Sequence, residues 1–261
     1  MILRAFFFSF SSEWLKRKRS YTLPLAAGSA FFIPTIIFLA RFRRIDALPS
    51  LYQAPRFWEG LWLQAWESMA FMILPMAIML VASLIAQIEY RNNAWKQLHA
   101  TPQSLATIFA AKLAVILVLV VQLVVWFNLA LYLAGILPAL IFAKVDAPAS
   151  PIPFAHFARR DLAFIVDVLP IVALQYLLAL RSKSFVAPLG IGMALWILSV
   201  GTMRWKYNYL IPYSYAGIDY LMTEYARKLV LPANTQVMAG ICFLAITTGG
   251  FVLYASRTDK G

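Results

Sequence analysis

The chain has 261 residues, of which 62% are hydrophobic and 13% are charged. An average soluble domain is roughly 45–50% apolar and about 25% charged, so a soluble domain of this length is excluded. Disorder is excluded as well, because disordered segments are poor in apolar residues. The composition predicts an all-α polytopic membrane protein, with residues 1–261 forming one transmembrane domain.

The net charge is +12, from 23 lysine and arginine residues against 11 aspartate and glutamate residues. Basic residues collect where helices leave the bilayer and meet anionic headgroups. We prefer this interpretation to nucleic-acid binding, because no basic segment is long enough to build a separate soluble domain. The single cysteine, Cys242, lies in an apolar run, which excludes a disulfide framework or a cysteine-based metal site within the chain.

Six segments reach the length of about 20 mainly apolar residues that a membrane-crossing helix needs. They are approximately Tyr21–Ala40, Trp66–Gln87, Ile108–Phe142, Leu162–Leu180, Phe185–Met203 and Val237–Ala255. The third is too long for one straight crossing, so it either tilts or ends near Tyr132 and continues as an interfacial piece before Pro138. The first exceeds the about 7–15 residues of a signal-peptide core, so we expect it to be retained.

Residues 1–20, before the first span, are predicted to form an amphipathic helix in the headgroup plane. One side of its helical wheel is polar and carries Ser9, Ser12, Glu13 and Lys16. The other side is apolar and carries Leu3, Phe6, Phe7, Phe10 and Trp14. We expect the apolar side to enter lipid and the basic run from Lys16 and Arg17 to residue 19 to hold anionic lipid. The alternative is a simple extension of the first span.

The loop at residues 88–104 is predicted to contain a short, two-faced helix. Ile88, Trp95 and Leu98 share one face, and Arg91 precedes Trp95 by one turn, where a guanidinium can lie over the indole. A rigid helix with an exposed tryptophan is suited to docking on another protein. A solvated connector is the alternative interpretation.

Two further loops are predicted on the opposite side. Residues 143–161 contain three prolines and are expected to form an extended surface loop. Residues 204–236 are expected to contain an interfacial or re-entrant helix, because apolar side chains recur at helical spacing from Ile218 to Leu229. The tyrosines of this segment are typical of an aromatic belt at the headgroups.

Several kinds of catalytic site are missing from the sequence. No glycine is followed by lysine, so the chain has no G-x-x-x-x-G-K-[ST] phosphate loop, and no G-x-S-x-G nucleophile elbow occurs. His99 and His156 lie in separate loops and in no zinc-binding pattern, so we expect neither a metal site nor a bound cofactor.

Carboxylates within spans are candidates for a transport pathway. Glu67 and Asp167 are the two that qualify. Both are expected close to the ends of their spans, at an interface that water reaches, so ordinary solvation or pairing with an arginine is the alternative to a role in the pathway.

Three segments resemble parts of the ABC-2 type transporter permeases. Residues 8–20 look like the interfacial helix that opens such permeases, and residues 89–102, followed by Lys112, resemble their first cytoplasmic loop. Residues 210–214 resemble their last outer loop. The six-span arrangement, without a large outer domain, is most similar to small permeases of peptide-antibiotic immunity exporters.

The resemblance implies a permease subunit of an ABC exporter. Residues 88–104 would be a coupling helix that docks on a separate ATPase subunit, which binds ATP and Mg²⁺, through Glu89, Arg91, Asn92, Trp95 and Lys96. A second copy, or a similar permease, would complete the pathway. Lysines and arginines divide almost evenly between the two sides, so charge alone leaves the orientation open; a coupling helix implies cytoplasmic N- and C-termini in the cell membrane. A membrane enzyme acting on lipids and a secondary transporter remain as alternatives.

Overall fold

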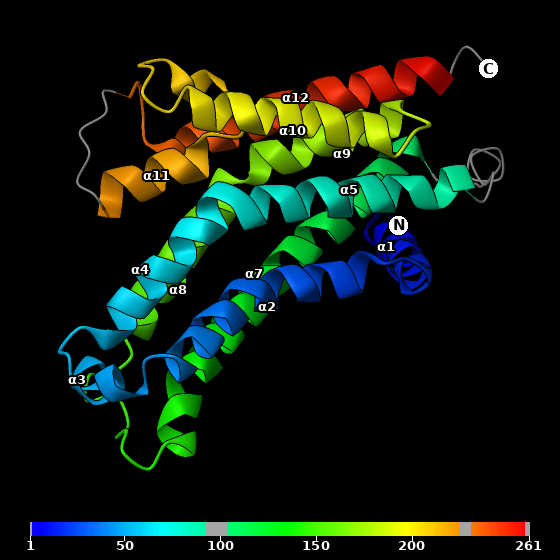
Figure 1. Cartoon of the computed structure of the whole chain (residues 1–261). Helices are drawn as coiled ribbons and strands as arrows, with labels where there is room; N and C mark the ends of the chain where they lie inside the picture. Colours follow the sequence, from blue (N-terminus) through cyan, green and yellow to red (C-terminus); the bar gives the residue numbers. More distant parts are fainter. Residues whose placement is uncertain (1, 92–103, 225–230, 259–261) are drawn as a thin grey trace.

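The computed structural model describes residues 2–91, 104–224 and 231–258, and within these ranges it contains helices and no strand (Figure 1). The helices are α1 (Ile2–Lys16), α2 (Thr22–Phe42), α3 (Leu48–Tyr52), α4 (Phe57–Ser68), α5 (Leu74–Arg91), α7 (Leu105–Ile141), α8 (Phe154–Asp167), α9 (Leu169–Arg181), α10 (Val186–Gly201), α11 (Tyr215–Glu224) and α12 (Thr235–Thr258). The predicted all-α class is confirmed.

Five helical segments of the described chain are long and apolar enough to cross a membrane. They are Thr22–Phe42, Phe57–Ile88, Leu105–Ile141, Phe154–Arg181 and Thr235–Ser256. The predicted fifth span is present as the shorter apolar helix α10, whose 16 residues extend about 24 Å. The chain is therefore a polytopic membrane protein, and α10 alone falls short of the length expected for a full crossing.

The second span begins nine residues earlier than Trp66, where it was predicted to start, and it is bent. It consists of α4, a π-helical turn at Met69–Ile73, and α5. Pro75 follows this turn and has no amide hydrogen to donate, so the regular hydrogen-bond ladder is interrupted here. Glu59 and Gln64 lower the hydropathy of α4, but its tryptophans at 58, 62 and 66 face inward and are buried.

The fourth span is bent in a similar way. α8 ends at Asp167 and α9 starts at Leu169, with Pro170 at its second position. α8 begins at Phe154, so the prediction of a loop through Asp161 is wrong for its second half. Charged residues on α8 lower the mean hydropathy of this segment, so its first half was not predicted to be part of a span. The buried side of α8 carries Phe164. Figure 1 shows α4 and α8 inclined together away from α5 and α9.

The third span is one continuous helix, α7, of 37 residues and about 55 Å. The alternative of a break near Tyr132 is therefore wrong. Pro138 lies inside its last turn and has no N–H for the carbonyl of Ala134, four residues before it. Arg41 of α2 takes that place, because its Nη1 donates to the Ala134 oxygen at 2.6 Å and to Tyr52 Oη at 2.5 Å. Tyr52 in turn donates to the Gly135 oxygen at 2.8 Å.

The two ends of the molecule carry different elements. α1, the last turn of α5, the first turn of α7 and the last turn of α12 lie at one end, which we call the α1 end (Figure 1). α3, the first turns of α4 and α8 and the last turn of α7 lie at the other, which we call the α3 end. The N-terminal helix and the end of α12 thus share one end of the bundle.

α11 packs against α8, α12 and the π-helical turn. Tyr213, Tyr215 and Tyr220, predicted to belong to a belt at the headgroups, are buried within the protein. Tyr220 donates to the carbonyl of Leu63 at 2.9 Å. The aromatic-belt interpretation is therefore wrong for these three tyrosines, because they hold α11 against the spans.

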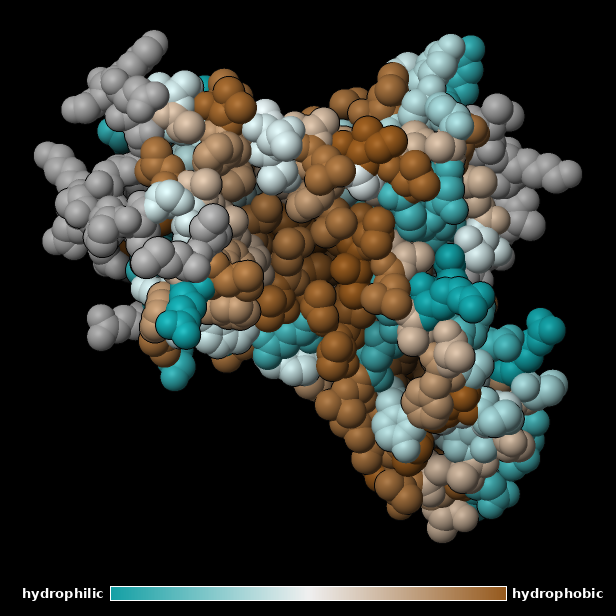
Figure 2. Space-filling model, turned by 180° about the vertical axis from the view of Figure 1, so that it is seen from behind, coloured by the Kyte–Doolittle hydropathy of each residue, from teal (hydrophilic) through white to brown (hydrophobic). Residues whose placement is uncertain are grey.

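A broad apolar surface crosses the middle of the molecule, as Figure 2 shows from behind. The large exposed apolar side chains of the described residues come mainly from α2, α7, α10 and α12. α2 is 17% buried over its most apolar window and α12 is 11% buried, against 67% for the second span. Helices that are apolar on nearly all sides and yet exposed are the ones expected to face lipid.

Candidate functional site

The N-terminal helix turns its polar side to the protein, which is the reverse of the prediction. α1 packs along α7, with Ser9 3% exposed and Glu13 6% exposed, whereas Leu3 and Phe7 are 72% and 62% exposed. The exposed apolar strip still suits an interfacial helix. Ser9 and Glu13 of the polar side, however, are buried against the protein, whereas Ser12 stays exposed.

Glu13 is held between two lysines at the α1 end. Its Oε2 accepts a hydrogen bond from Lys112 Nζ of α7 at 2.5 Å, and its Oε1 accepts one from Lys16 Nζ at 2.6 Å. Burial by itself raises the pKa of Glu13, but the charges and hydrogen bonds of Lys112 and Lys16 outweigh it, so the pKa lies below its ordinary value. Lys16 therefore contacts Glu13, whereas the sequence had suggested anionic lipid.

The predicted aromatic side of α1 forms a ladder. Phe6 stacks on Phe10 at 6.4 Å between ring centroids, and Phe10 stacks on Trp14 at 5.8 Å. The guanidinium of Arg17 lies 3.6 Å from the centre of the Trp14 ring. The three rings are half-buried and Arg17 is buried. These side chains therefore contact the protein more than they would contact lipid.

The predicted coupling residues lie outside the part of the chain that the structure describes. Asn92, Trp95 and Lys96 fall in the segment 92–103, and the side chains of Glu89 and Arg91 are also outside the description. Their role stays a prediction.

The structure describes the backbone on either side of residues 92–103, at the end of α5 and the start of α7. The end of α5 and Ser104, which caps α7 by accepting a hydrogen bond from the Thr107 amide at 3.2 Å, lie at the α1 end. Lys112, the partner of Glu13, follows two turns into α7.

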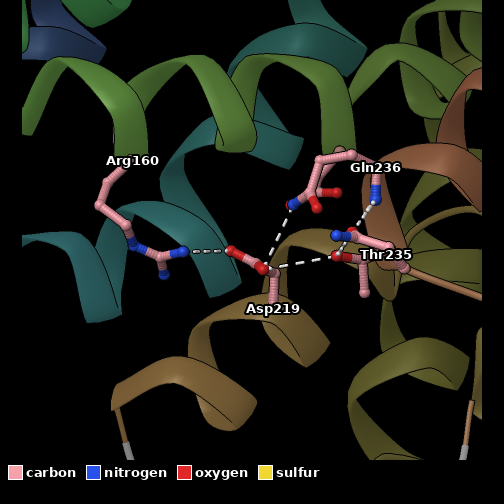
Figure 3. Close-up of polar contacts among 6 residues, drawn as sticks. Arg160, Asp219, Thr235 and Gln236 are labelled. Carbon is pink, nitrogen blue, oxygen red and sulfur yellow. Dashed lines mark hydrogen bonds and ion pairs between the residues drawn. The ribbon is translucent and has the colours of Figure 1, made fainter.

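A buried polar cluster joins α8, α11 and α12 (Figure 3). Arg160 Nη1 of α8 donates to Asp219 Oδ2 of α11 at 3.0 Å. From the opposite side, Thr235 Oγ1 and Gln236 Nε2 of α12 donate to Asp219 Oδ1 at 3.4 and 3.3 Å. Gln236 Nε2 also donates to Asp167 Oδ2 at 3.1 Å, so one amide bridges two carboxylates.

The cluster corrects the predicted position of Asp167. That residue is the last of the 14 residues of α8, about 20 Å from the helix start, and is 0% exposed. Its Oδ1 is buried and makes no close hydrogen bond within the described residues. Asp167 is therefore deep in the protein rather than at a wet interface.

Glu67, the other predicted pathway carboxylate, lies apart from this cluster. It is the eleventh of the 12 residues of α4, about 15 Å into its span, and its side chain is exposed on the surface. The prediction that it lies at most one turn inside its span is wrong. The structure places one candidate in the interior and the other on the outer face of α4.

Sequence reasoning missed Arg160, Asp219, Thr235 and Gln236. Arg160 and Asp167 are seven residues apart, or two turns, so they lie on one face of α8. That spacing was readable once α8 was known to begin at Phe154. Asp219 is an acid directly flanked by Ile218 and Tyr220 in α11, which was a second available signal.

The arrangement links three helices near the bend between α8 and α9. A buried ion pair is costly to break, because removing one partner leaves an uncompensated charge. Movement of α12 relative to α8 would separate Gln236 from Asp167, so the cluster is sensitive to the relative position of these helices.

The comparisons agree with this membrane architecture. A family model described as ABC-2 family transporter protein matches residues 9–199, which is most of the chain and runs from the middle of α1 almost to the end of α10. No curated protein and no solved structure shows a significant match. The match extends from the helix that carries Glu13 through the bent spans to α10. The chain therefore belongs to the ABC-2 transporter family and is a transmembrane permease of an ABC transporter.

Proposed function

We propose that this permease is the membrane subunit of an exporter and that a separate ATPase subunit docks at its α1 end. Permease domains of this family work with an ATP-binding subunit. The 261 residues contain no phosphate loop of the G-x-x-x-x-G-K-[ST] kind. The observation that carries the proposal is the gathering of α1, the end of α5 and the start of α7 at one end of the molecule.

Coupling is proposed to run through α1 and α7 as one unit. Lys112 ties α7 to Glu13 at 2.5 Å, so a push on the start of α7 also moves α1. α5 leads from the same end to the π-helical turn at Met69–Ile73, where the hydrogen-bond ladder is already interrupted. A helix bends at such a turn with the loss of few further backbone hydrogen bonds. ATP-driven movement at the α1 end would therefore rock α4 and α8 relative to α5 and α9.

Two permeases, identical or similar, are proposed to form the pathway between them. Each would be surrounded by lipid on the apolar faces of α2 and α12. Because ATP is cytoplasmic, the α1 end is proposed to face the cytoplasm, with both termini on that side of the cell membrane.

Cysteine labelling tests this orientation. Single cysteines at the exposed positions Ser12 and Ser256 of the α1 end and Ala147 of the α3 end are introduced in a Cys242→Ser background. We expect an impermeant maleimide to label Ala147→Cys in intact cells and the other two only after permeabilisation. Labelling of Ser12→Cys in intact cells would contradict the proposed orientation.

A pull-down with tagged permease tests the docking site. Trp95→Ala is expected to release the ATPase subunit, because a tryptophan in an interface is often worth about 2 kcal/mol or more on truncation. Glu89→Ala is expected to retain the ATPase and uncouple hydrolysis from transport. Trp205→Ala is the matched control, since Trp205 is 48% exposed and lies beyond the far end of α10.

The outcomes separate the alternatives. Full retention of the ATPase by Trp95→Ala would show that this loop does not dock it. Transport that continues without ATP and follows a proton gradient would instead support a secondary transporter.

A further inference from the structure

A cavity at the α3 end combines aromatic walls with one carboxylate. It has a volume of about 170 Å³ and lies between α4, α7, α8 and the loop before α8. Its walls include Trp58, Trp62, Tyr132 and Phe157, and Asp161 is its one charged lining residue. An apolar cavity of about 150 Å³ holds a molecule the size of benzene, so this one has room for a single ring-sized group.

The aromatic walls are fixed in place. Trp58 stacks on Tyr132 with ring centroids 5.8 Å apart, and Trp62 stacks on Phe157 at 5.4 Å. Trp58 Nε1 also donates to the Ser150 carbonyl at 3.1 Å, which ties its ring to the loop. The faces of such rings carry negative charge density and attract cations.

Asp161 has no cationic partner within the described residues. The guanidinium of its sequence neighbour, Arg160, is turned to Asp219. Oδ1 of Asp161 is buried and makes no close hydrogen bond, and the donors beside this carboxylate are neutral: the indole N–H groups of Trp62 and Trp66 and the side-chain amide of Asn128. A buried carboxylate without a counter-charge is unfavourable, so a ligand that brings a positive charge gains from both the acid and the rings.

We propose that this cavity binds an ammonium group carried on an apolar body. A bare divalent cation is a poor fit, because Mg²⁺ and Ca²⁺ need several oxygen ligands and the walls are mostly rings. A neutral hydrocarbon is also a poor fit, because it leaves Asp161 unpaired. The ammonium group comes either from a lipid headgroup or from a soluble amphiphilic cation.

Equilibrium binding to the purified full chain tests the site. The probe is benzyltrimethylammonium, and neopentylbenzene is its uncharged analogue of the same shape. We expect the cation to bind at least tenfold more tightly than the analogue. Asp161→Asn is expected to weaken binding of the cation at least tenfold, while Glu59→Gln leaves it unchanged. Glu59 lies on α4, the helix that carries Trp58 and Trp62. Its side chain pairs with Arg56 at 3.6 Å and is outside the cavity.

A second pair of variants does not depend on the buried acid. Tyr132 is 39% exposed, so its replacement should be tolerated by the fold. Tyr132→Ala is expected to weaken binding of the cation about two- to fivefold, as a partly exposed cation–π contact would, and Tyr132→Phe is expected to retain it. Equal binding of cation and analogue, or unchanged binding in both Asp161→Asn and Tyr132→Ala, would overturn the proposal.

Nanodiscs distinguish the two sources. Affinity is expressed as the ratio between wild type and Asp161→Asn in each disc, which cancels the attraction of the cationic probe to anionic headgroups. If lipid headgroups occupy the cavity, this ratio is smaller in phosphatidylcholine than in phosphatidylglycerol discs. If a soluble cation is the ligand, the two discs give the same ratio. Binding here needs no ATPase subunit, so a negative result leaves the proposed transport function untouched, and loss of the proposed ATPase docking leaves this site untouched.

Discussion

Two polar contacts of this protein have opposite balances of acidic and basic side chains. At the α1 end, one carboxylate, Glu13, lies between Lys16 and Lys112. In the cluster of α8, α11 and α12, one guanidinium, Arg160, faces two carboxylates, of which Asp219 pairs with it and Asp167 does not. The first contact has more basic than acidic side chains, and the second has more acidic than basic ones.

The difference follows from what surrounds each contact. Lys16 is 32% exposed, so anionic headgroups and water reach the positive surplus. Asp167 is 0% exposed, so its carboxyl group is met by neutral donors, of which the Gln236 amide is the clearest. A surplus charge near the surface is stabilised by its medium, whereas an interior one needs side-chain dipoles placed by the fold.

Removing Arg160 is expected to have the largest effect. Arg160→Met leaves two buried carboxylates without a cation, which we expect to cost about 3–5 kcal/mol of stability. Thermal unfolding in detergent measures it. Arg159→Met, at an exposed position on the same helix, is the control and is expected to be nearly neutral.

A double variant sharpens the same point. Asp219→Asn added to Arg160→Met should recover part of the lost stability, because one of the two unpaired charges is gone. No recovery would mean that the loss comes from packing of Arg160 on Phe164, over whose ring the guanidinium lies at 5.1 Å.

Removing the charge of Glu13 is expected to have a smaller effect. Glu13→Gln leaves Lys112 buried without its anion and should cost about 1–3 kcal/mol of stability. Glu59→Gln, on an exposed pair, is the control and is expected to change stability by less than about 1 kcal/mol. A loss as large as that of Arg160→Met would show that the headgroup side is no better screened than the interior.

The Glu13 contact is expected to depend on pH. The folded-state pKa of Glu13 lies below its ordinary value of 4.5. The stability that it contributes is thus fully present above about pH 4.5 and is lost as the pH falls through the lower, folded-state pKa. The difference in unfolding temperature between wild type and Glu13→Gln should shrink over that acid range, and a constant difference would contradict the assigned ion pair.

Removing the bridging amide is expected to have the smallest effect. Gln236→Ala loses the contacts to Asp167 and Asp219 and should cost about 0.5–1.5 kcal/mol. Gln236→Lys brings a cation to the two carboxyl groups and is expected to be at least as stable as wild type. A Gln236→Lys variant less stable than Gln236→Ala would show that this excess of carboxyl groups over cations does not favour a further cation.

Much of the architecture was predictable from local sequence. Apolar runs of sufficient length identified the spans, and α7 and α12 were found nearly at their observed ends. The starts of α4 and α8 were missed, because hydropathy averages over all faces of a helix. Glu59 and Arg159 are exposed on the same turns that bury Trp58 and Arg160.

The candidate site was less predictable. Asp167 was identified as an intramembrane carboxylate, but its partners come from segments that are distant in the chain. Asp219 and Gln236 meet it only because α11 and α12 pack on α8. The helical wheel of α1 separated an apolar from a polar side but assigned their surroundings wrongly. A wheel does not show that Lys112 of α7 lies within hydrogen-bonding distance of Glu13.

The amino-acid sequence by itself determined the membrane class, the helical content and the approximate spans, since these depend on the length and composition of each segment. Tertiary structure alone decided which polar groups meet. Transfer of a side chain to lipid depends on that side chain, whereas the stability of a buried charge depends on a partner at hydrogen-bonding distance. For Glu13 that partner is 99 residues away, and for Arg160 it is 59 residues away.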